Sequence, residues 1–94
     1  MRMPKKRKQK ENLERLEKAL GILQQVYESP QTPRNVRKVV KDSLDMLKND
    51  EMTPAVRAAN VMSMLDEVMQ DPNMPSFIRV TLWNTFSILE GIRE

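Results

Sequence analysis

The chemistry open to this 94-residue sequence depends on carboxylates and amines, because it contains neither histidine nor cysteine. Neighbouring acids occur as the pairs Asp42/Asp45, Asp50/Glu51 and Asp66/Glu67. Carboxylates on facing helices can hold two iron ions, but such sites also need a Glu-x-x-His motif, which cannot exist here. Imidazole acid–base catalysis and thiolate chemistry are excluded for the same reason. The only two glycines form no phosphate-binding loop. We therefore predict a protein that is not an enzyme and holds neither cofactor nor metal.

The amines are concentrated in a basic N-terminal arm, which carries a charge of +6 over its first ten residues. The arm contains no acid, and its bases are Arg2, Lys5, Lys6, Arg7, Lys8 and Lys10. The other 84 residues carry ten bases and thirteen acids, so the body is mildly acidic. Such an arm can neutralise phosphates of nucleic acid or the ribosome without reading a sequence. It has no aromatic residue with which to stack on bases. The alternative is a solvated tail that aids solubility.

Apolar periodicity divides the rest of the chain into four helices, and these must position any functional surface. Residues 1–9 have no such period, and we predict a disordered arm there and a single domain over residues 10–94. The residues Leu13, Leu16, Leu20, Leu23 and Tyr27 recur at steps of three and four, which predicts a helix from Lys10 to Glu28. Three further helices should begin at Thr32-Pro33, Thr53-Pro54 and Pro75, where a hydroxyl can cap free N–H groups and proline suits the first helical position. Short loops favour antiparallel neighbours.

The chain repeats itself with a period of 42 residues, so that Ala19–Lys48 aligns with Val61–Glu90. Identical residues occur at Leu23/Leu65, Val26/Val68, Pro30/Pro72, Pro33/Pro75, Arg37/Arg79 and Leu47/Leu89. Each repeat corresponds to one helical hairpin. Two hairpins are fewer than the roughly three units that an open stacked array needs. We therefore predict an all-α four-helix bundle of two helical-hairpin pseudo-repeats, in which Leu23 and Leu65 are equivalent core positions.

A short motif gives this bundle a weakly HEAT-like character. Pro33-x-x-Val36-Arg37 and Pro75-x-x-Ile78-Arg79 resemble the start of the second helix of HEAT repeats, and Thr53–Arg57 misses the pattern by one residue. In those repeats the aliphatic residue packs inward and the arginine bonds to acids of a neighbouring unit. This resemblance implies a scaffold that presents a binding face. A capped helix with a surface arginine is the alternative.

Two aromatic residues differ from their counterparts in the first repeat. Trp83 aligns with Lys41, and Phe77 aligns with Asn35. If the geometry repeats, both aromatics lie on the outer side of the last helix, and exposed aromatic pairs are typical of interfaces. A core anchor at the end of the bundle is the equal alternative for Trp83. The first interpretation predicts a self-associating protein.

The sequence offers nothing that would take the chain into a membrane. No run of 18 apolar residues is present, and the charged start lacks the apolar region of a signal peptide. We therefore expect a cytoplasmic protein with no membrane partner.

Several segments resemble a known family, the small and mostly archaeal proteins of uncharacterised protein family 0147. The resemblance is carried by the length, the basic start, Ser29–Arg37 (SPQTPRNVR) and Thr53–Asn60 (TPAVRAAN). It implies a four-helix bundle and brings no activity, cofactor or catalytic residue. The function that we expect is a non-enzymatic protein-interaction module that forms homo-oligomers. The alternative is a nucleic-acid- or ribosome-associated protein that binds phosphates through its arm.

Overall fold

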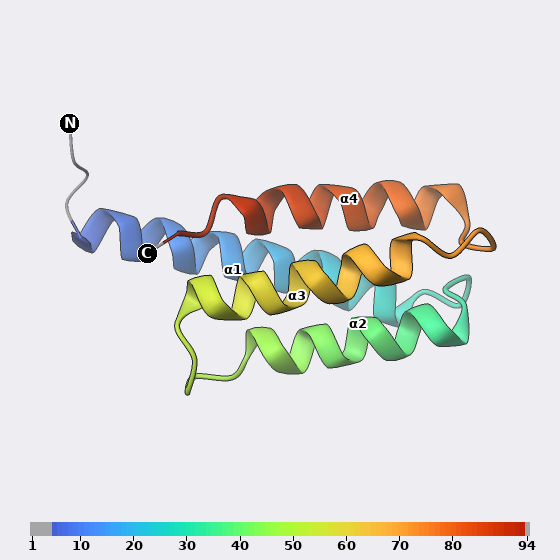
Figure 1. The fold of residues 1–94 in the computed structure, drawn as a ribbon, viewed down its shortest axis with the longest axis horizontal. Coiled ribbons are helices and arrows are strands. Elements are labelled where there is room, and N and C mark those ends of the chain that lie inside the picture. Colours follow the sequence, from blue (N-terminus) through green and yellow to red (C-terminus); the bar gives the residue numbers. More distant parts are fainter. Residues whose placement is uncertain (1–4, 94) are drawn as a thin grey trace.

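The computed structural model describes residues 5–93, with side chains from Lys8 onward, and shows four antiparallel helices (Figure 1). The helices are α1 (Lys5–Glu28), α2 (Arg34–Leu47), α3 (Pro54–Met69) and α4 (Ser76–Glu90). Each helix packs against the next one in the chain, and α4 closes the ring by packing against α1. Of the two diagonal pairs, α1 and α3 contact each other, so α2 and α4 lie on opposite sides of the bundle. The predicted all-α four-helix bundle is confirmed.

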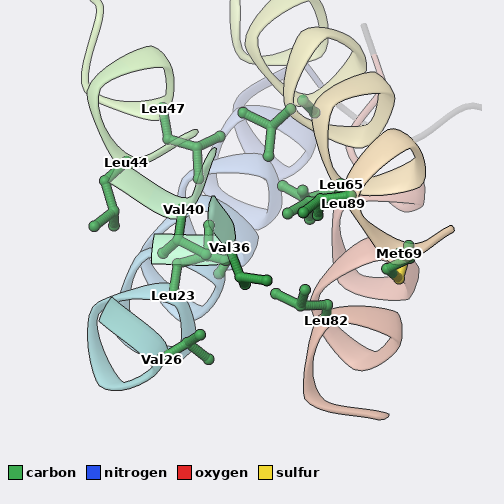
Figure 2. Close-up of a cluster of buried hydrophobic side chains, with 14 of the residues drawn as sticks. Leu23, Val26, Val36, Val40, Leu44, Leu47, Leu65, Met69, Leu82 and Leu89 are labelled. Carbon is green, nitrogen blue, oxygen red and sulfur yellow. The ribbon is translucent and has the colours of Figure 1, made fainter. Parts of the chain in front are cut away.

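The core confirms the repeat. Leu23 and Leu65 are both fully buried, and Figure 2 shows them among the inward-pointing side chains. The equivalent pairs Val36/Ile78, Val40/Leu82 and Leu47/Leu89 are also buried. Two buried hydroxyls within the helices also correspond, because Ser43 on α2 and Thr85 on α4 each donate to the carbonyl four residues earlier, at 2.8 and 3.1 Å. The two hairpins therefore use the same inner faces.

The start of α3 differs in its capping from those of α2 and α4, where Pro33 and Pro75 are N-caps and not, as predicted, the first helical residues. The Thr53 hydroxyl accepts the N–H of Val56 at 3.3 Å, and Pro54 is the first helical residue, as predicted. The corresponding prediction for Thr32 is wrong. Pro33 itself is the N-cap of α2, and the Thr32 hydroxyl instead donates to the Val26 carbonyl at 2.6 Å. Thr32 lies one residue too early to reach the free N–H groups of α2. Its hydroxyl therefore bonds to a carbonyl in the last turn of α1.

The apolar stripe predicted on α1 is correct except at its start. Leu13 is 54% exposed, whereas the adjacent Asn12 is buried. The Asn12 amide donates to the Arg93 carbonyl at 2.8 Å and accepts the Arg93 N–H at 3.4 Å. This paired contact mimics a backbone interaction and turns Asn12, not Leu13, toward the bundle.

The basic start of α1 overhangs the bundle. The helix begins at Lys5, earlier than the predicted start at Lys10, because nothing from Lys5 to Lys10 interrupts helical hydrogen bonding. The end of α4 lies alongside Asn12, through Arg93, and alongside Arg15, whose guanidinium covers Gly91. Residues before Asn12 thus project past α4, as Figure 1 shows. The predicted disordered arm, residues 1–9, is helical from Lys5 onward, whereas residues 1–4 lie outside the described part and their disorder stays a prediction.

Across residues 5–93, no helix is both long and apolar enough to cross a membrane.

Candidate interaction surfaces

Three arginines join each helix start to the end of the helix before it. Arg37 donates to the Ser29 carbonyl at 2.9 Å, directly after α1. Arg79 donates to the Asp71 carbonyl at 2.7 Å, just beyond α3. Ser29 and Asp71 are themselves equivalent in the 42-residue repeat. A cation at the C-terminal end of a helix also interacts favourably with the helix dipole.

Arg57 joins the start of α3 to the end of α2 in the same way, although its motif misses the HEAT pattern by one residue. It donates to the carbonyls of Leu47 and Met52 at 3.0 and 2.9 Å. Each of the three arginines is the fourth residue after its N-cap, where its own N–H bonds to the N-cap carbonyl. Counting from the cap and not from the proline would have identified all three. The three arginines donate to backbone carbonyls. Among the described residues they do not form the bonds to acids of a neighbouring unit that the HEAT-like motif implied.

The outer face of α4 is apolar. Phe77, Val80 and Trp83 are 52, 59 and 50% exposed, and their spacing of three residues places them on one side of the helix. We call these three residues the α4 face. Trp83 meets Phe86 edge to face, with ring centroids 5.3 Å apart. Both sequence-predicted aromatics are therefore surface residues. Val80 was missed by sequence reasoning, although its alignment with the charged Lys38 carried the same signal.

The equivalent face of α2 is polar. Asn35, Lys38 and Lys41 stand at the positions of Phe77, Val80 and Trp83, and all three are exposed. Lys41 forms an ion pair with Asp45 across one turn, at 3.9 Å. The two hairpins thus present the same geometry with opposite surface chemistry.

The basic arm lies apart from these faces. Lys8 is half-buried and Lys10 is exposed, and the backbone of Lys5, Lys6 and Arg7 belongs to the overhanging turns of α1. Arg2 lies outside the described residues. The overhang is at the end of the bundle that holds the α2–α3 loop, opposite the α1–α2 and α3–α4 loops (Figure 1). The structure brings Phe77 and Trp83 together but places neither beside the arm's start.

A groove of about 570 Å³ runs between α2 and α3, and sequence reasoning did not predict it. We call it the α2–α3 groove. Its apolar lining comes from Val39, Met64 and Val68, and its acids are Asp42, Glu67 and Asp71. Asp42 and Glu67 belonged to different predicted acid pairs, and only the packing of two helices brings them to one groove.

Asp71 is the carboxylate with the clearest structural partners. Its oxygens accept the Asn73 N–H at 2.9 Å and the Asn35 amide at 2.8 Å. These hydrogen bonds hold the pKa of Asp71 below its ordinary value of 3.8, and the bond from the Asn73 N–H has the largest effect. Asp71 is therefore ionised at neutral pH. No group of three or more potential ligands for a metal occurs among the residues that the structure describes.

Comparison with known proteins places the chain among archaeal relatives. A protein of Metallosphaera sedula is 44% identical over 84 residues, which cover 89% of this chain and 94% of the relative. A protein of Aeropyrum pernix is 39% identical over 84 residues, or 89% of this chain and 92% of its own length. Both carry only the name of the family.

A solved structure has the same fold. The crystal structure of a protein from Thermoplasma acidophilum superposes with a TM-score of 0.84 at 32% identity, covering 89% of this chain and 99% of that one. It too comes from a family described as uncharacterised. The model of that family matches residues 3–92 here. The resemblance seen in the sequence is thereby confirmed, and the chain belongs to the uncharacterised protein family UPF0147.

Proposed function

We propose that this protein is a non-enzymatic interaction module that self-associates through the α4 face. The observation that carries the proposal is the contrast between the two hairpins. Phe77, Val80 and Trp83 replace polar residues at three matching outer positions, while the inner faces are conserved between hairpins. Because the α2 version of this face is polar, the fold itself does not require apolar residues there.

The surroundings of the α4 face also favour burial against a partner. Between Arg79 and Glu90 the helix carries no charged residue, and the Arg79 guanidinium is directed to the Asp71 carbonyl. A contiguous apolar patch with aromatic residues at its centre is typical of interface cores, and charged residues are depleted there. A second copy supplies a matching apolar face in a two-fold dimer.

The non-enzymatic part of the proposal rests on the absence of histidine and cysteine, and the groove acid Asp71 adds one observation. A carboxylate that acts as a general acid needs a raised pKa, so that it holds a proton at neutral pH. The pKa of Asp71 in the α2–α3 groove is lowered instead. A self-associating module of this kind fits the expected cytoplasmic location.

Sedimentation equilibrium over micromolar concentrations tests the self-association. Trp83→Lys restores the residue of the first hairpin, and we expect it to raise the dimer dissociation constant at least about tenfold, as for a buried aromatic anchor. Val56→Lys is the matched control, because Val56 is an exposed apolar residue on α3, away from the α4 face. Dilution should also shift the fluorescence of Trp83, the single tryptophan, to the red.

Two results would count against this proposal. Wild-type protein that stays monomeric throughout the concentration range would remove the dimer. If Trp83→Lys unfolds the chain and Val56→Lys does not, Trp83 is needed for the fold, and the α4 face loses its best anchor.

A second candidate function is phosphate binding by the basic arm, as in a nucleic-acid- or ribosome-associated protein. The overhang of α1 favours it, because Lys8 and Lys10 precede Asn12, which already contacts Arg93 just after the end of α4. Replacing Lys5, Lys6, Arg7, Lys8 and Lys10 by Gln should abolish retention on RNA or DNA at low salt. Wild-type binding should fall linearly on a log–log plot with salt, with a slope of about −0.9 per neutralised phosphate on duplex DNA. Absence of any low-salt binding would exclude this function.

A further inference from the structure

We propose that the α2–α3 groove receives the basic start of α1 from a second copy of the chain. The groove is open and largely apolar in its lining, and its three acids are Asp42 on α2, Glu67 on α3 and Asp71 just beyond α3. A lysine or arginine side chain suits such a surface, because its aliphatic stem can cover apolar groups while its charged head meets carboxylates. The start of α1 is the one strongly basic segment of the chain.

The repeat shows that an equivalent pair of helices packs together without the groove acids. The equivalent surface lies between α4 and α1, and there Asp42, Glu67 and Asp71 align with Asn84, Gln25 and Ser29. Two of these neutral residues are close in shape to the acids that they match. Ser29 even repeats the local turn, since its hydroxyl accepts the Gln31 N–H at 3.4 Å, as Asp71 accepts that of Asn73. At these three positions the negative charge belongs to the α2–α3 pair alone, although the groove's Gln70 aligns with Glu28, so the equivalent surface keeps one acid.

A chain cannot place its own basic segment in its own groove. The segment belongs to α1, a continuous helix from Lys5 to Glu28. From Lys8 to Glu28 the axis rises by about 30 Å. The groove lies near the other end, where Asn35 at the start of α2 bonds to Asp71 beyond α3 (Figure 1). The occupant must therefore come from another molecule.

A second copy brings the right segment to the right place. Two bundles that lie side by side and antiparallel bring each overhang to the groove end of the other, in a two-fold arrangement with two identical contacts. Charge complementarity supports this pairing, because the arm carries +6 and the other 84 residues carry −3. The contact uses a different surface from the α4 face, so either can fail without the other.

Peptide binding to the full-length protein tests the inference. The probe is a fluorescein-labelled peptide of residues 1–10, titrated at low salt and followed by anisotropy at protein concentrations where the chain is monomeric. The groove variant combines Asp42→Asn with Glu67→Gln, which are the residues of the equivalent surface. The matched control combines Asp45→Asn with Asp66→Asn, which removes the same charge from the same two helices outside the groove.

We expect the groove variant to weaken peptide binding at least about tenfold and the control to change it less than about twofold, because the groove charges contact the peptide directly. Trp83→Lys should bind the peptide like wild type, which separates this inference from the proposed α4 interface. Equal losses in the two double variants would mean general attraction to an acidic body and would overturn the inference. A peptide that binds RNA but does not bind the protein would also overturn the inference.

A charge swap provides the second measurement. Asp42→Lys in the protein should weaken its binding of the wild-type peptide. A peptide that carries Lys8→Glu should recover part of the lost affinity for this variant. Recovery with a swapped pair requires that the two segments meet. If the swapped peptide binds Asp42→Lys no better than it binds wild type, the groove is not where the arm binds.

Discussion

The three arginines at the helix starts show how single residues hold the loops of this bundle. The ends of α1, α2 and α3 leave carbonyl groups without helical partners. Arg37, Arg57 and Arg79 each donate to one or two of these carbonyls or their neighbours. The three arginines are half-buried against the loops, so their stems also shield these contacts from water.

Arg57→Ala should destabilise the folded state by about 1–3 kcal/mol, because two carbonyls lose a charged donor. Urea unfolding followed by circular dichroism measures the change. Arg34→Ala is the control, since Arg34 is exposed at the start of α2 and should shift the free energy of unfolding by less than about 0.5 kcal/mol. Equal effects of the two substitutions would show that the Arg57 contacts add nothing.

Asp71 predicts how stability changes in acid. Its folded-state pKa lies below the ordinary value of 3.8, so its ionised form stabilises the fold. That contribution is complete above pH 3.8 and is lost as the pH falls through the lower folded value. Asp71→Asn should therefore flatten the loss of stability below about pH 4, measured as urea midpoints against pH. Asp66→Asn, a carboxylate exposed on α3, is the control, and parallel curves for all three proteins would contradict the assignment.

The hairpin is the element that repeats, and its core positions should respond alike. Leu23 and Leu65 are equivalent and fully buried. Leu23→Ala and Leu65→Ala should each cost about 2–5 kcal/mol, and the two costs should be similar because the surrounding inner faces correspond. Leu13→Ala is the control, because Leu13 is largely exposed. A cost below about 0.5 kcal/mol at both leucines would contradict their burial in the core, and clearly unequal costs would contradict their equivalence.

Helices and their repeat could be predicted from the sequence because both depend on local patterns. Apolar spacing located four helices, and the alignment of Leu23 with Leu65 identified matching core sites. Errors arose where distant contacts decide the outcome. Asn12 is buried only because Arg93 lies beside it, and Thr32 turns back to Val26 because the chain reverses there.

The α4 face could be predicted from the sequence and the α2–α3 groove could not, because only the first depends on a local pattern. The α4 face lies on one helix, so Trp83 and Phe77 could be identified by alignment with Lys41 and Asn35. The α2–α3 groove joins residues from two helices, and their pairing register is not a local property of the sequence. Asp42 and Glu67 therefore stood apart in the sequence, although the folded chain places both in one groove.

At the scale of the whole molecule, the α4 face and the α2–α3 groove can be occupied at once. Because α2 and α4 lie on opposite sides of the bundle, a partner on one surface leaves the other open. The forces differ as well. In the proposed contacts, burial of Phe77, Val80 and Trp83 against a partner would be hydrophobic and would tolerate salt, whereas pairing of the arm with the groove acids would be screened by salt.

The assembly should therefore shrink in steps as salt is added. We expect species larger than a dimer at about 50 mM salt and a dimer at about 1 M, where the screening length falls to about 3 Å. Sedimentation velocity distinguishes these species. Asp42→Asn with Glu67→Gln should give the dimer even at low salt, while Trp83→Lys should leave only the salt-sensitive contact and become monomeric at high salt. A size distribution that does not depend on salt in the wild-type protein would contradict the presence of two interfaces, because only an apolar contact would then hold the copies together.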